Sequence, residues 1–456
     1  MIVTVNPATG RKIADYELHS TSEVDERIEA AHQAQKIWGR KPVSERVTLL
    51  TSVAEVLRRN KTRYAATITE EMGKPLAEAE AEIEKCAITC EFYAGSAEKY
   101  LGDEHIESNA SDSRVVFDPL GVVLAIMPWN YPFWQFVRFA APALAAGNGA
   151  LLKHANNVAA CALLLEELFR EAGTPEGLIG TLLINSSDVA GVLADERVAA
   201  VTLTGSTEVG KIVAAQAGSL MKKQVLELGG SDPFIVLADA DIELAAKMAV
   251  KARFSNTGQS CISSKRFIVE ASVADRFVQL FCEGVKKLKT GNPVDRDNVI
   301  GPMARENLRD ALHAQVERSV SEGAQLLLGG QPVEGEGFYY LPTVLDHVTP
   351  QMTAAIEETF GPVAAIVRVQ SEEEAIAVAN NTEFGLGAAV WTADTNNGYR
   401  VARQIEAGAV FVNGLVASDA RLPFGGIKQS GYGRELGEFG IREFTNIKTL
   451  WIGPAV

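Results

Sequence analysis

At 456 residues the chain is too long for one ordinary hydrophobic core, so we expect two or three domains with ample buried area. Hydrophobic residues at 47% and charged residues at 22% are typical of a globular protein. The formal net charge of −15 argues against a nucleic acid or an anionic membrane as a partner. No basic start precedes an apolar run, and no stretch approaches the roughly 20 apolar residues of a membrane span. We therefore expect a cytoplasmic protein.

The cysteines and histidines do not predict a metal site. The 5 cysteines are few and odd in number, as is usual in a reducing compartment. Cys86 and Cys90 have the spacing of a metal pair on a helix, but no further cysteine or histidine lies near them in the sequence. We expect them to pack in a core. The 6 histidines are scattered without ligand spacing, so we predict no metal.

Before residue 105, the apolar residues recur at helical spacing. Ser22 and Asp25, near the start of the first helical segment, resemble a capping box. The predicted helices are Ser22–Trp38, Ser44–Arg59, Arg63–Met72 and Leu76–Leu101.

After residue 119, short apolar runs alternate with helical patterns, which predicts parallel sheets covered on both faces by helices. The first series has strands at 121–127, 150–153, 181–184, 199–204 and 224–228, and helices at 134–146, 158–172, 188–194 and 207–217. The second series has strands at 234–237, 266–269 and 364–367, and helices at 242–254, 274–287 and 373–380. We expect two α/β domains, with the chain crossing between them at Glu227–Asp232.

The segment Phe254–Cys261 places one thiol among glycine, amide and hydroxyl residues. Glu227, followed by Leu-Gly-Gly, lies upstream of it. A catalytic cysteine needs a base and donors for an oxyanion, and the chain has candidates for each. This grouping indicates covalent chemistry on a carbonyl carbon.

Two strand ends offer cofactor-binding candidates. Gly205 and Ser206 lie between a predicted strand and a predicted helix, where backbone N–H groups favour a pyrophosphate. The GxGxxG pattern is absent, so a simple serine cap of the helix remains an alternative. Lys153 also ends a strand and could reach a ribose or phosphate, although a lone lysine at a strand end is more often simply solvated.

Asn130 lies in a turn between Pro128 and Pro132, directly after a predicted strand. Because prolines stiffen the turn, the amide would be a preorganised oxyanion donor. The alternative is an asparagine that satisfies backbone groups of the turn.

Together these motifs resemble the aldehyde dehydrogenase superfamily over nearly the full length. The matching motifs are Asn6–Gly10, Pro128–Asn130, Gly205–Thr207, Glu227–Gly230, Gly258–Cys261, Glu357–Pro362, Pro423–Gly426 and Lys448. The resemblance implies NAD(P)-dependent oxidation of a small aldehyde by a homodimer or homotetramer. It implies a Rossmann-like cofactor domain (1–104 and 118–231), an α/β catalytic domain (232–429) and an oligomerisation arm (105–117 and 430–456).

The resemblance also implies residue roles. Cys261 would be the nucleophile, Asn130 and the Cys261 backbone N–H would bind the oxyanion, and Glu227 would activate water to hydrolyse a thioester. Burial would raise the pKa of Glu227 toward neutrality, which suits a base.

For the cofactor, the resemblance assigns Gly205 and Ser206 to the pyrophosphate, Lys153 to the adenosine ribose, Glu358 and Phe360 to the nicotinamide ribose and ring, and Trp129 to the pyrophosphate channel. Many NAD-preferring relatives have a glutamate at the position of Asn156. Because Asn156 does not repel a 2′-phosphate, we expect NADP to be accepted and preferred over NAD.

Within the family, the chain is similar to bacterial succinate-semialdehyde dehydrogenases. Arg138 would bind the distal carboxylate of the substrate and Ser418 would add a hydrogen bond. The alternative for Arg138 is an ion pair with a nearby acid. Some members of this group have a further arginine at the position of Ser255, so other small aldehydes would compete as substrates.

Three other functions are weighed against this one. A CoA-acylating aldehyde dehydrogenase has no use for a hydrolytic base, so Glu227 argues against it. A papain-like hydrolase would need a histidine partner and its own local signature, which the sequence around Cys261 lacks. A binding protein without activity would not need Cys261, Glu227 and Asn130 together.

Overall fold

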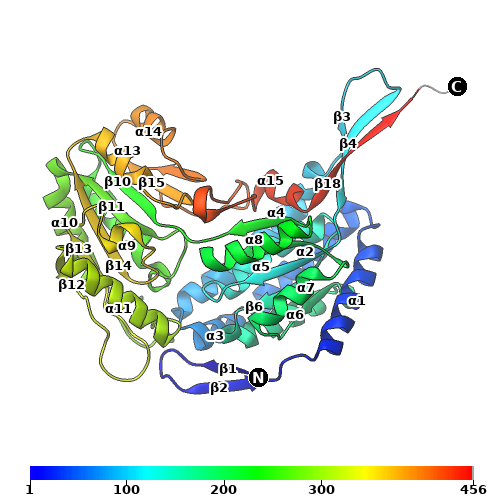
Figure 1. Ribbon diagram of the computed structural model, residues 1–456, viewed down its shortest axis with the longest axis horizontal. Coiled ribbons are helices and arrows are strands. Elements are labelled where there is room, and N and C mark those ends of the chain that lie inside the picture. Colours follow the sequence, from blue (N-terminus) through cyan, green and yellow to red (C-terminus); the bar gives the residue numbers. More distant parts are fainter. Residues whose placement is uncertain (454–456) are drawn as a thin grey trace.

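The computed structural model describes residues 1–453, which form two α/β units and a projecting three-stranded arm (Figure 1). The helices that precede the first parallel strand lie close to their predicted positions. They are α1 (Thr21–Trp38), α2 (Val43–Arg59), α3 (Lys61–Met72) and α4 (Leu76–Tyr100).

The capping box of α1 is formed by Ser20 and Glu23, so the prediction of Ser22 and Asp25 is wrong. Ser20 Oγ accepts a hydrogen bond from Glu23 N at 3.3 Å, and the Glu23 carboxylate accepts one from Ser20 N at 2.7 Å. A glutamate at this position is long enough to reach back to the capping residue's own N–H, and Ser20–Glu23 offers that pair one turn earlier.

The first unit contains a sheet, here called the N-terminal sheet, with the strand order β17-β9-β8-β5-β6-β7. Its strands are parallel except for β17. They are β5 (Val122–Met127), β6 (Gly149–His154), β7 (Ile179–Thr181), β8 (Val198–Thr204), β9 (Lys223–Glu227) and β17 (Gly431–Tyr432). The connecting helices are α5 (Pro132–Ala145), α6 (Ala159–Glu171), α7 (Val189–Ala194) and α8 (Thr207–Ser219).

Both faces of the N-terminal sheet are covered by helices. Along β5, Val123 and Ala125 pack with residues of α2 to α6, whereas Val122 and Leu124 pack with residues of α1, α7 and α8. This alternation is the two-residue period of a strand that is buried on both sides. It explains why the strand reads as a continuous apolar run.

Strand β7 ends before most of the segment predicted for it. The predicted strand at 181–184 is instead a buried loop after Thr181, in which Leu182 and Ile184 are buried side chains. Beyond Leu182, whose N–H still bonds the Leu152 carbonyl of β6, the apolar run reflects burial, which the sequence alone does not distinguish from a strand.

The second unit contains the C-terminal sheet, with the strand order β12-β13-β14-β11-β10-β15-β16. The strands are β10 (Asp232–Val236), β11 (Ser264–Glu270), β12 (Gln325–Leu328), β13 (Thr343–Asp346), β14 (Val363–Val369), β15 (Gly387–Trp391) and β16 (Ala409–Val412). Its helices are α9 (Ile242–Phe254), α10 (Ala271–Val285), α11 (Glu306–Ser321), α12 (Thr353–Ile356), α13 (Glu372–Asn380) and α14 (Thr395–Ala402). The chain crosses between the two sheets after Glu227, where β9 ends, and β10 begins at Asp232.

The arm is a sheet of β3 (Glu104–His105), β4 (Asp112–Pro119) and β18 (Thr445–Ile452), and it extends away from both units (Figure 1). It is shorter than the predicted arm at its C-terminal part. Residues 431–443 belong to the first unit instead, because β17 pairs with β9 and α15 (Gly437–Glu443) packs against α4 and α5. The last predicted arm residues, 454–456, lie outside the described part of the chain.

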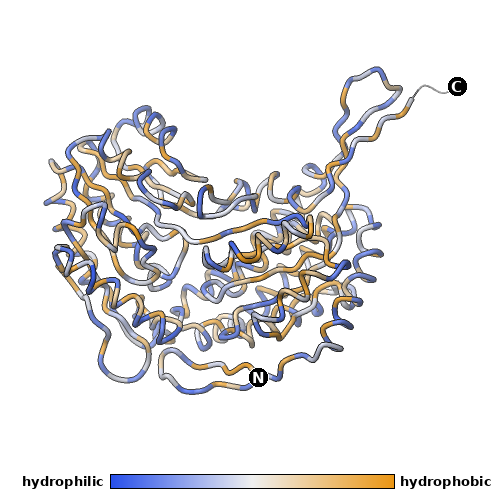
Figure 2. The backbone as a smooth tube through the Cα atoms, in the orientation of Figure 1, coloured by the Kyte–Doolittle hydropathy of each residue, from blue (hydrophilic) through white to orange (hydrophobic). Residues whose placement is uncertain are grey.

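Apolar residues follow the strands and the inner faces of the helices, while the outer faces are mostly polar (Figure 2). A two-stranded hairpin of β1 (Ile2–Val5) and β2 (Lys12–Tyr16) lies beside the first unit. Among residues 1–453, no helix has the length and apolarity needed to span a membrane.

Candidate active site

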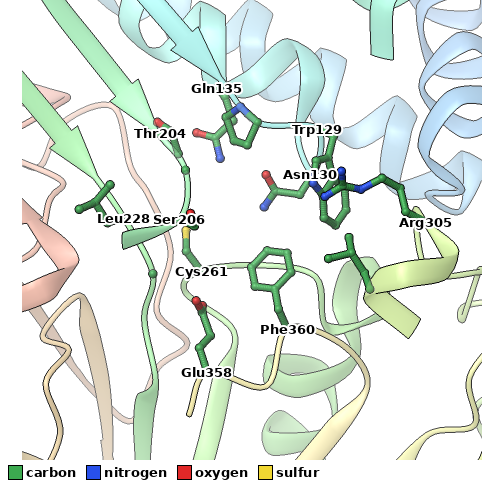
Figure 3. Close-up of a pocket in the computed structure, with 14 residues that line it drawn as sticks. Trp129, Asn130, Gln135, Thr204, Ser206, Leu228, Cys261, Arg305, Glu358 and Phe360 are labelled. Carbon is green, nitrogen blue, oxygen red and sulfur yellow. The ribbon is translucent and has the colours of Figure 1, made fainter. Parts of the chain in front are cut away.

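The candidate site lies at the carboxyl ends of the N-terminal sheet. Strands β5, β8 and β9 are neighbours in this sheet and run parallel, so the turns that follow them meet at one edge. These turns contribute Trp129, Ser206 and Leu228 to a cavity of about 250 Å³ (Figure 3). A second cavity of about 480 Å³ lies next to it, and Gln135 and Cys261 line both.

Cys261 is held in a constrained loop between α9 and β11. Asn256 and Thr257 have φ values of 53° and 56°, and Gly258 has 71°, all in the left-handed region. A Cβ atom on Gly258 would collide with the carbonyl of Gly361, so this position requires glycine. Lys265 Nζ donates hydrogen bonds to the carbonyls of Ser260 and Cys261, each at 2.9 Å. The unusual backbone and the buried lysine together fix the thiol between the two cavities.

The surroundings of Cys261 favour its protonated form over the thiolate. Burial raises the pKa of Cys261 to about 12, although the positive charges of Arg138 and Lys265 act in the opposite direction. Since the thiolate is the nucleophile, Arg138 and Lys265, whose charges lower this pKa, favour the reactive form.

Asn130 projects into the first cavity beside Cys261 (Figure 3). Its Nδ2 donates one hydrogen bond to the Gln259 carbonyl at 3.1 Å, which leaves the second hydrogen available. The backbone carbonyl of Asn130 accepts a hydrogen bond from Asn256 Nδ2 at 2.9 Å, so the Asn130 turn and the Cys261 loop are joined in both directions. The Asn130 amide therefore bonds the Cys261 loop and not its own turn, and its oxyanion role stays a prediction.

Glu227 is the last residue of β9, and its side chain is 2% exposed. Neither of its carboxylate oxygens has a hydrogen-bond partner among the described residues. Burial raises the pKa of Glu227 well above its usual range, and the negative charge of Glu435 adds to the effect. A Cβ on Gly425 would lie 2.6 Å from Glu227 Oε1, so glycine there leaves room for the carboxyl. Its neighbours Leu228 and Gly229 line the first cavity, whereas the Glu227 side chain does not.

The residues predicted to bind the nicotinamide and the pyrophosphate of a cofactor gather at the first cavity. Trp129, Gly205, Ser206, Glu358 and Phe360 all line it. The ring of Phe360 packs edge-on against that of Trp129 at 5.7 Å between centroids. Glu358 accepts a hydrogen bond from Gly230 N at 3.1 Å and lies 3.3 Å from Lys265 Nζ.

Ser206 is also the N-cap of α8, since its Oγ accepts a hydrogen bond from Val209 N at 3.4 Å. The capping alternative is therefore correct as a structural role. Gly205 and Ser206 line the first cavity, and the first N–H groups of a helix have no acceptor within the helix, so the cap is compatible with anion binding.

Lys153 and Asn156 lie at and after the end of β6, outside the lining of both cavities. Lys153 Nζ donates hydrogen bonds to the His154 carbonyl and to Asn156 Oδ1, each at 2.9 Å. Burial lowers the pKa of Lys153 to about 8. Both partners are neutral, so the ammonium has no carboxylate to balance it among residues 1–453.

Arg138 and Ser418, which were predicted to bind the substrate, line the second cavity together with Ser255. Arg138 is 2% exposed and forms a buried ion pair with Glu435. Its guanidinium also lies 4.7 Å from the ring centroid of Phe424. The alternative of an internal ion pair is thus observed, and the charge of Arg138 is balanced within the chain.

Sequence reasoning missed Glu435, Gln135 and Lys85 as site residues. Glu435 follows a glycine-rich segment with no spacing that marks it, and only the fold brings it to Arg138. Lys85 has a signal that was available: with Glu78, Ala81 and Glu82 it forms one helical stripe of α4, and all four line the second cavity. A charged stripe of this kind is usually a solvated face, so the sequence did not distinguish it.

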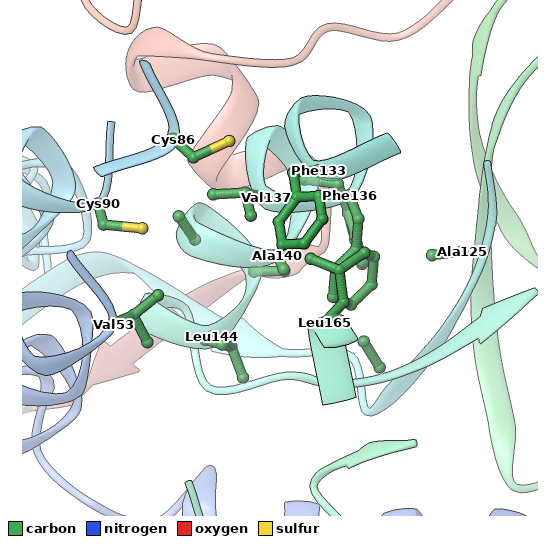
Figure 4. Close-up of a cluster of buried hydrophobic side chains, with 14 of the residues drawn as sticks. Val53, Cys86, Cys90, Ala125, Phe133, Phe136, Val137, Ala140, Leu144 and Leu165 are labelled. Atoms are coloured by element: carbon green, nitrogen blue, oxygen red, sulfur yellow. The ribbon is translucent and has the colours of Figure 1, made fainter. Parts of the chain in front are cut away.

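Cys86 and Cys90 pack in the core around α5 and show no sign of metal binding (Figure 4). Burial raises the pKa of both thiols, as expected of structural cysteines in an apolar environment. Within residues 1–453, no group of three or more histidine, cysteine or acidic side chains is placed to hold a metal ion.

The chain matches the aldehyde dehydrogenase family over residues 1–450. It belongs to this family and is an enzyme of the aldehyde dehydrogenase type. The fold agrees with that assignment, because it is shared with solved members of the family at TM-scores of 0.96 and 0.97.

Among similar sequences, a probable succinate-semialdehyde dehydrogenase (NADP+) of Synechocystis sp. is 49% identical over 99% of both chains. A succinate semialdehyde dehydrogenase (NAD(P)+) of Escherichia coli is 46% identical over 98% of this chain and 97% of its own length. Among solved structures, a succinic semialdehyde dehydrogenase of Streptococcus pyogenes in complex with NADP+ has a TM-score of 0.97 and 37% identity, with full coverage of both chains.

Proposed function

We propose that this aldehyde dehydrogenase oxidises succinate semialdehyde to succinate, with NADP+ as the preferred cofactor and NAD+ as an alternative. The observation that carries the proposal is the position of Cys261 between two cavities. One cavity is lined by the residues predicted for the nicotinamide, and the other contains basic and hydroxyl groups suited to a short substrate with a carboxylate. The names of the full-length relatives support the same substrate and cofactor.

The residues present fit a dinucleotide. The N-terminus of α8 at Ser206 offers N–H groups to a pyrophosphate, and Glu358 lies in the same cavity for a ribose. The Lys153 ammonium, which has no carboxylate partner among the described residues, would face the adenosine ribose or its phosphate. When bound, the nicotinamide accepts the hydride that converts a cysteine-bound hemithioacetal into a thioester.

We infer the following roles for the protein's own groups. The Cys261 thiol loses its proton to solvent, the thiolate sulfur adds to the aldehyde carbon, and Asn130 Nδ2 with the Cys261 N–H holds the carbonyl oxygen as it becomes negative. After oxidation the acyl group remains on the sulfur as a thioester. Glu227 takes a proton from water, the hydroxide adds to the thioester carbon, and the carbon–sulfur bond breaks to give the thiolate and the carboxylic acid, which then loses its proton to solvent.

Replacing Asn156 with glutamate should reverse the cofactor preference. The new carboxylate would pair with Lys153 and repel a 2′-phosphate, so KM for NADP+ should rise about tenfold or more. Saturation kinetics with both cofactors measure this, and Asn157→Glu at the adjacent position is the matched control. An unchanged ratio of kcat/KM values for the two cofactors would contradict the proposed role of Asn156.

The hydrolysis step should accelerate as pH rises. The pKa of Glu227 is raised by burial and by Glu435, so the fraction of Glu227 that is deprotonated increases with pH. Only the deprotonated carboxylate accepts a proton from water. The decay of the acyl-enzyme in single turnovers should therefore be faster at about pH 9 than at about pH 6. A rate independent of pH would show that Glu227 is not the base.

The substrate assignment is tested by comparing kcat/KM for succinate semialdehyde with that for butanal, which has the same chain length but no carboxylate. We expect a clear preference for succinate semialdehyde with NADP+. Equal values would leave a general aldehyde dehydrogenase, and a requirement for CoA would indicate the acylating type, for which Glu227 has no use.

We also propose that the two units act as cofactor domain and catalytic domain, and that the arm joins subunits of a homodimer or homotetramer. The arm strand β18 supports this, because Ile447, Trp451 and Ile452 are more than half exposed on it. Operation in the cytoplasm stays a prediction from the sequence.

A further inference from the structure

The second cavity is lined by one partly buried lysine that forms no ion pair among the described residues. Besides Arg138, its lining includes Lys85 from α4 and Lys251 from α9. Arg138 is paired with Glu435, and Lys251 is exposed. Lys85 is partly buried, with its ammonium 4.1 Å from the centroid of the Trp134 ring.

The acidic residues of the same helical stripe already have other partners. Glu82 accepts hydrogen bonds from the backbone N–H groups of Phe133 and Trp134 at 2.9 and 3.0 Å, and it pairs with Lys74. Glu78 accepts a hydrogen bond from Asn256 N at 2.7 Å. Neither forms an ion pair with Lys85 among the described residues, so its positive charge remains available.

Among the described residues, Lys85 makes a hydrogen bond that leaves the Ser418 hydroxyl free to act as a further donor. Lys85 Nζ donates to Ser418 Oγ at 2.6 Å. Because the serine oxygen accepts this bond, its own hydroxyl hydrogen is free to donate, and two hydrogens of the ammonium remain. Asp419 follows Ser418, but its carboxylate is held by Arg421. The pair Lys85–Ser418 therefore offers several donors and a net positive charge toward the cavity.

Burial also lowers the pKa of Lys85 to about 8, and the charge of Arg138 acts in the same direction. An anion placed beside the ammonium would recover part of this desolvation energy.

From this arrangement we propose that Lys85 and Ser418 bind the distal carboxylate of the substrate, and that Lys85 supplies the charge that selects a semialdehyde over an uncharged aldehyde. This inference rests on the proposed function and specifies its carboxylate site. Arg138 lines the same cavity, but its charge is already paired with Glu435. The carboxylate contact exists in both the bound substrate and the transition state, so its loss affects KM more than kcat.

The test replaces Lys85 with methionine, an unbranched side chain of similar length that contacts Trp134 without a charge. We expect KM for succinate semialdehyde to rise about 10- to 100-fold, the effect of losing a hydrogen bond to a charged group. We expect kcat, and kcat/KM for butanal, to stay within about twofold of the unchanged enzyme. Lys85→Arg should restore most of the preference, and Lys251→Met is the control for a lysine at the same cavity.

The outcomes separate the two proposals. If the unchanged enzyme does not prefer succinate semialdehyde over butanal, the proposed substrate fails. If it has the preference and Lys85→Met keeps it, or if Lys251→Met removes it equally, only the role of Lys85 fails. Should Lys85→Met not fold, the same comparison is read from Lys85→Gln together with inhibition by succinate, which should weaken about tenfold or more.

Discussion

Replacing Cys261 with alanine should lower kcat/KM for aldehyde oxidation by more than about 10,000-fold, because no other group could carry the acyl intermediate. The Cys261 thiol is one small side chain among many that line the two cavities. Its removal should therefore leave the surfaces that bind cofactor and substrate largely unchanged. The affinity for NADP+, measured by the quenching of tryptophan fluorescence, should change little.

The matched control is Cys282→Ala, which removes a thiol that is also partly exposed but lies on α10. That variant should keep its activity. Turnover by Cys261→Ala at even a few per cent of the original rate would show that oxidation does not pass through a bond to this sulfur.

Replacing Glu227 with glutamine should separate oxidation from hydrolysis. Attack by Cys261 and hydride loss need no carboxylate at this position, so one equivalent of reduced cofactor per active site should form rapidly. The following steady rate should fall about 100- to 10,000-fold, since glutamine cannot take a proton from water. Rapid-mixing absorbance of the reduced cofactor measures both phases.

The control for this variant is Glu71→Gln, which neutralises another buried carboxyl that accepts hydrogen bonds from Ala160 N and Cys161 N. It should show no separate burst and a nearly unchanged steady rate. A Glu227→Gln enzyme that loses the burst together with the steady rate would place the carboxyl in the oxidation step.

The sequence predicted the parallel strands β5, β6, β8, β9, β10, β11 and β14 because each is a run of apolar or β-branched residues between turns. It missed β15 (Gly387–Trp391), which starts Gly-Ala-Ala and has low strand propensity. Pairing with β10 and β16 imposes the strand there. Strand β12 was also missed. Its residues are mostly exposed at a sheet edge.

At the site, the sequence proposed residues in short motifs such as those of Asn130, Ser206 and Cys261, and the structure brings these three to one cavity. Local backbone chemistry fixes these, so motif and geometry agree. The charge balance around them was not predictable, because it depends on which distant acids and bases become neighbours. Glu435 beside Arg138, and the absence of any such partner at Lys85 among the described residues, arise only in the fold.

We expect an acyl group to rest on Cys261 between oxidation and hydrolysis. Peptide mass spectrometry of Glu227→Gln, quenched in acid after mixing with NADP+ and succinate semialdehyde, tests it most directly. The account predicts a succinyl group on the peptide that contains Cys261, in an amount equal to the reduced cofactor formed. Reduced cofactor without that modification, or the modification on another cysteine, would contradict it.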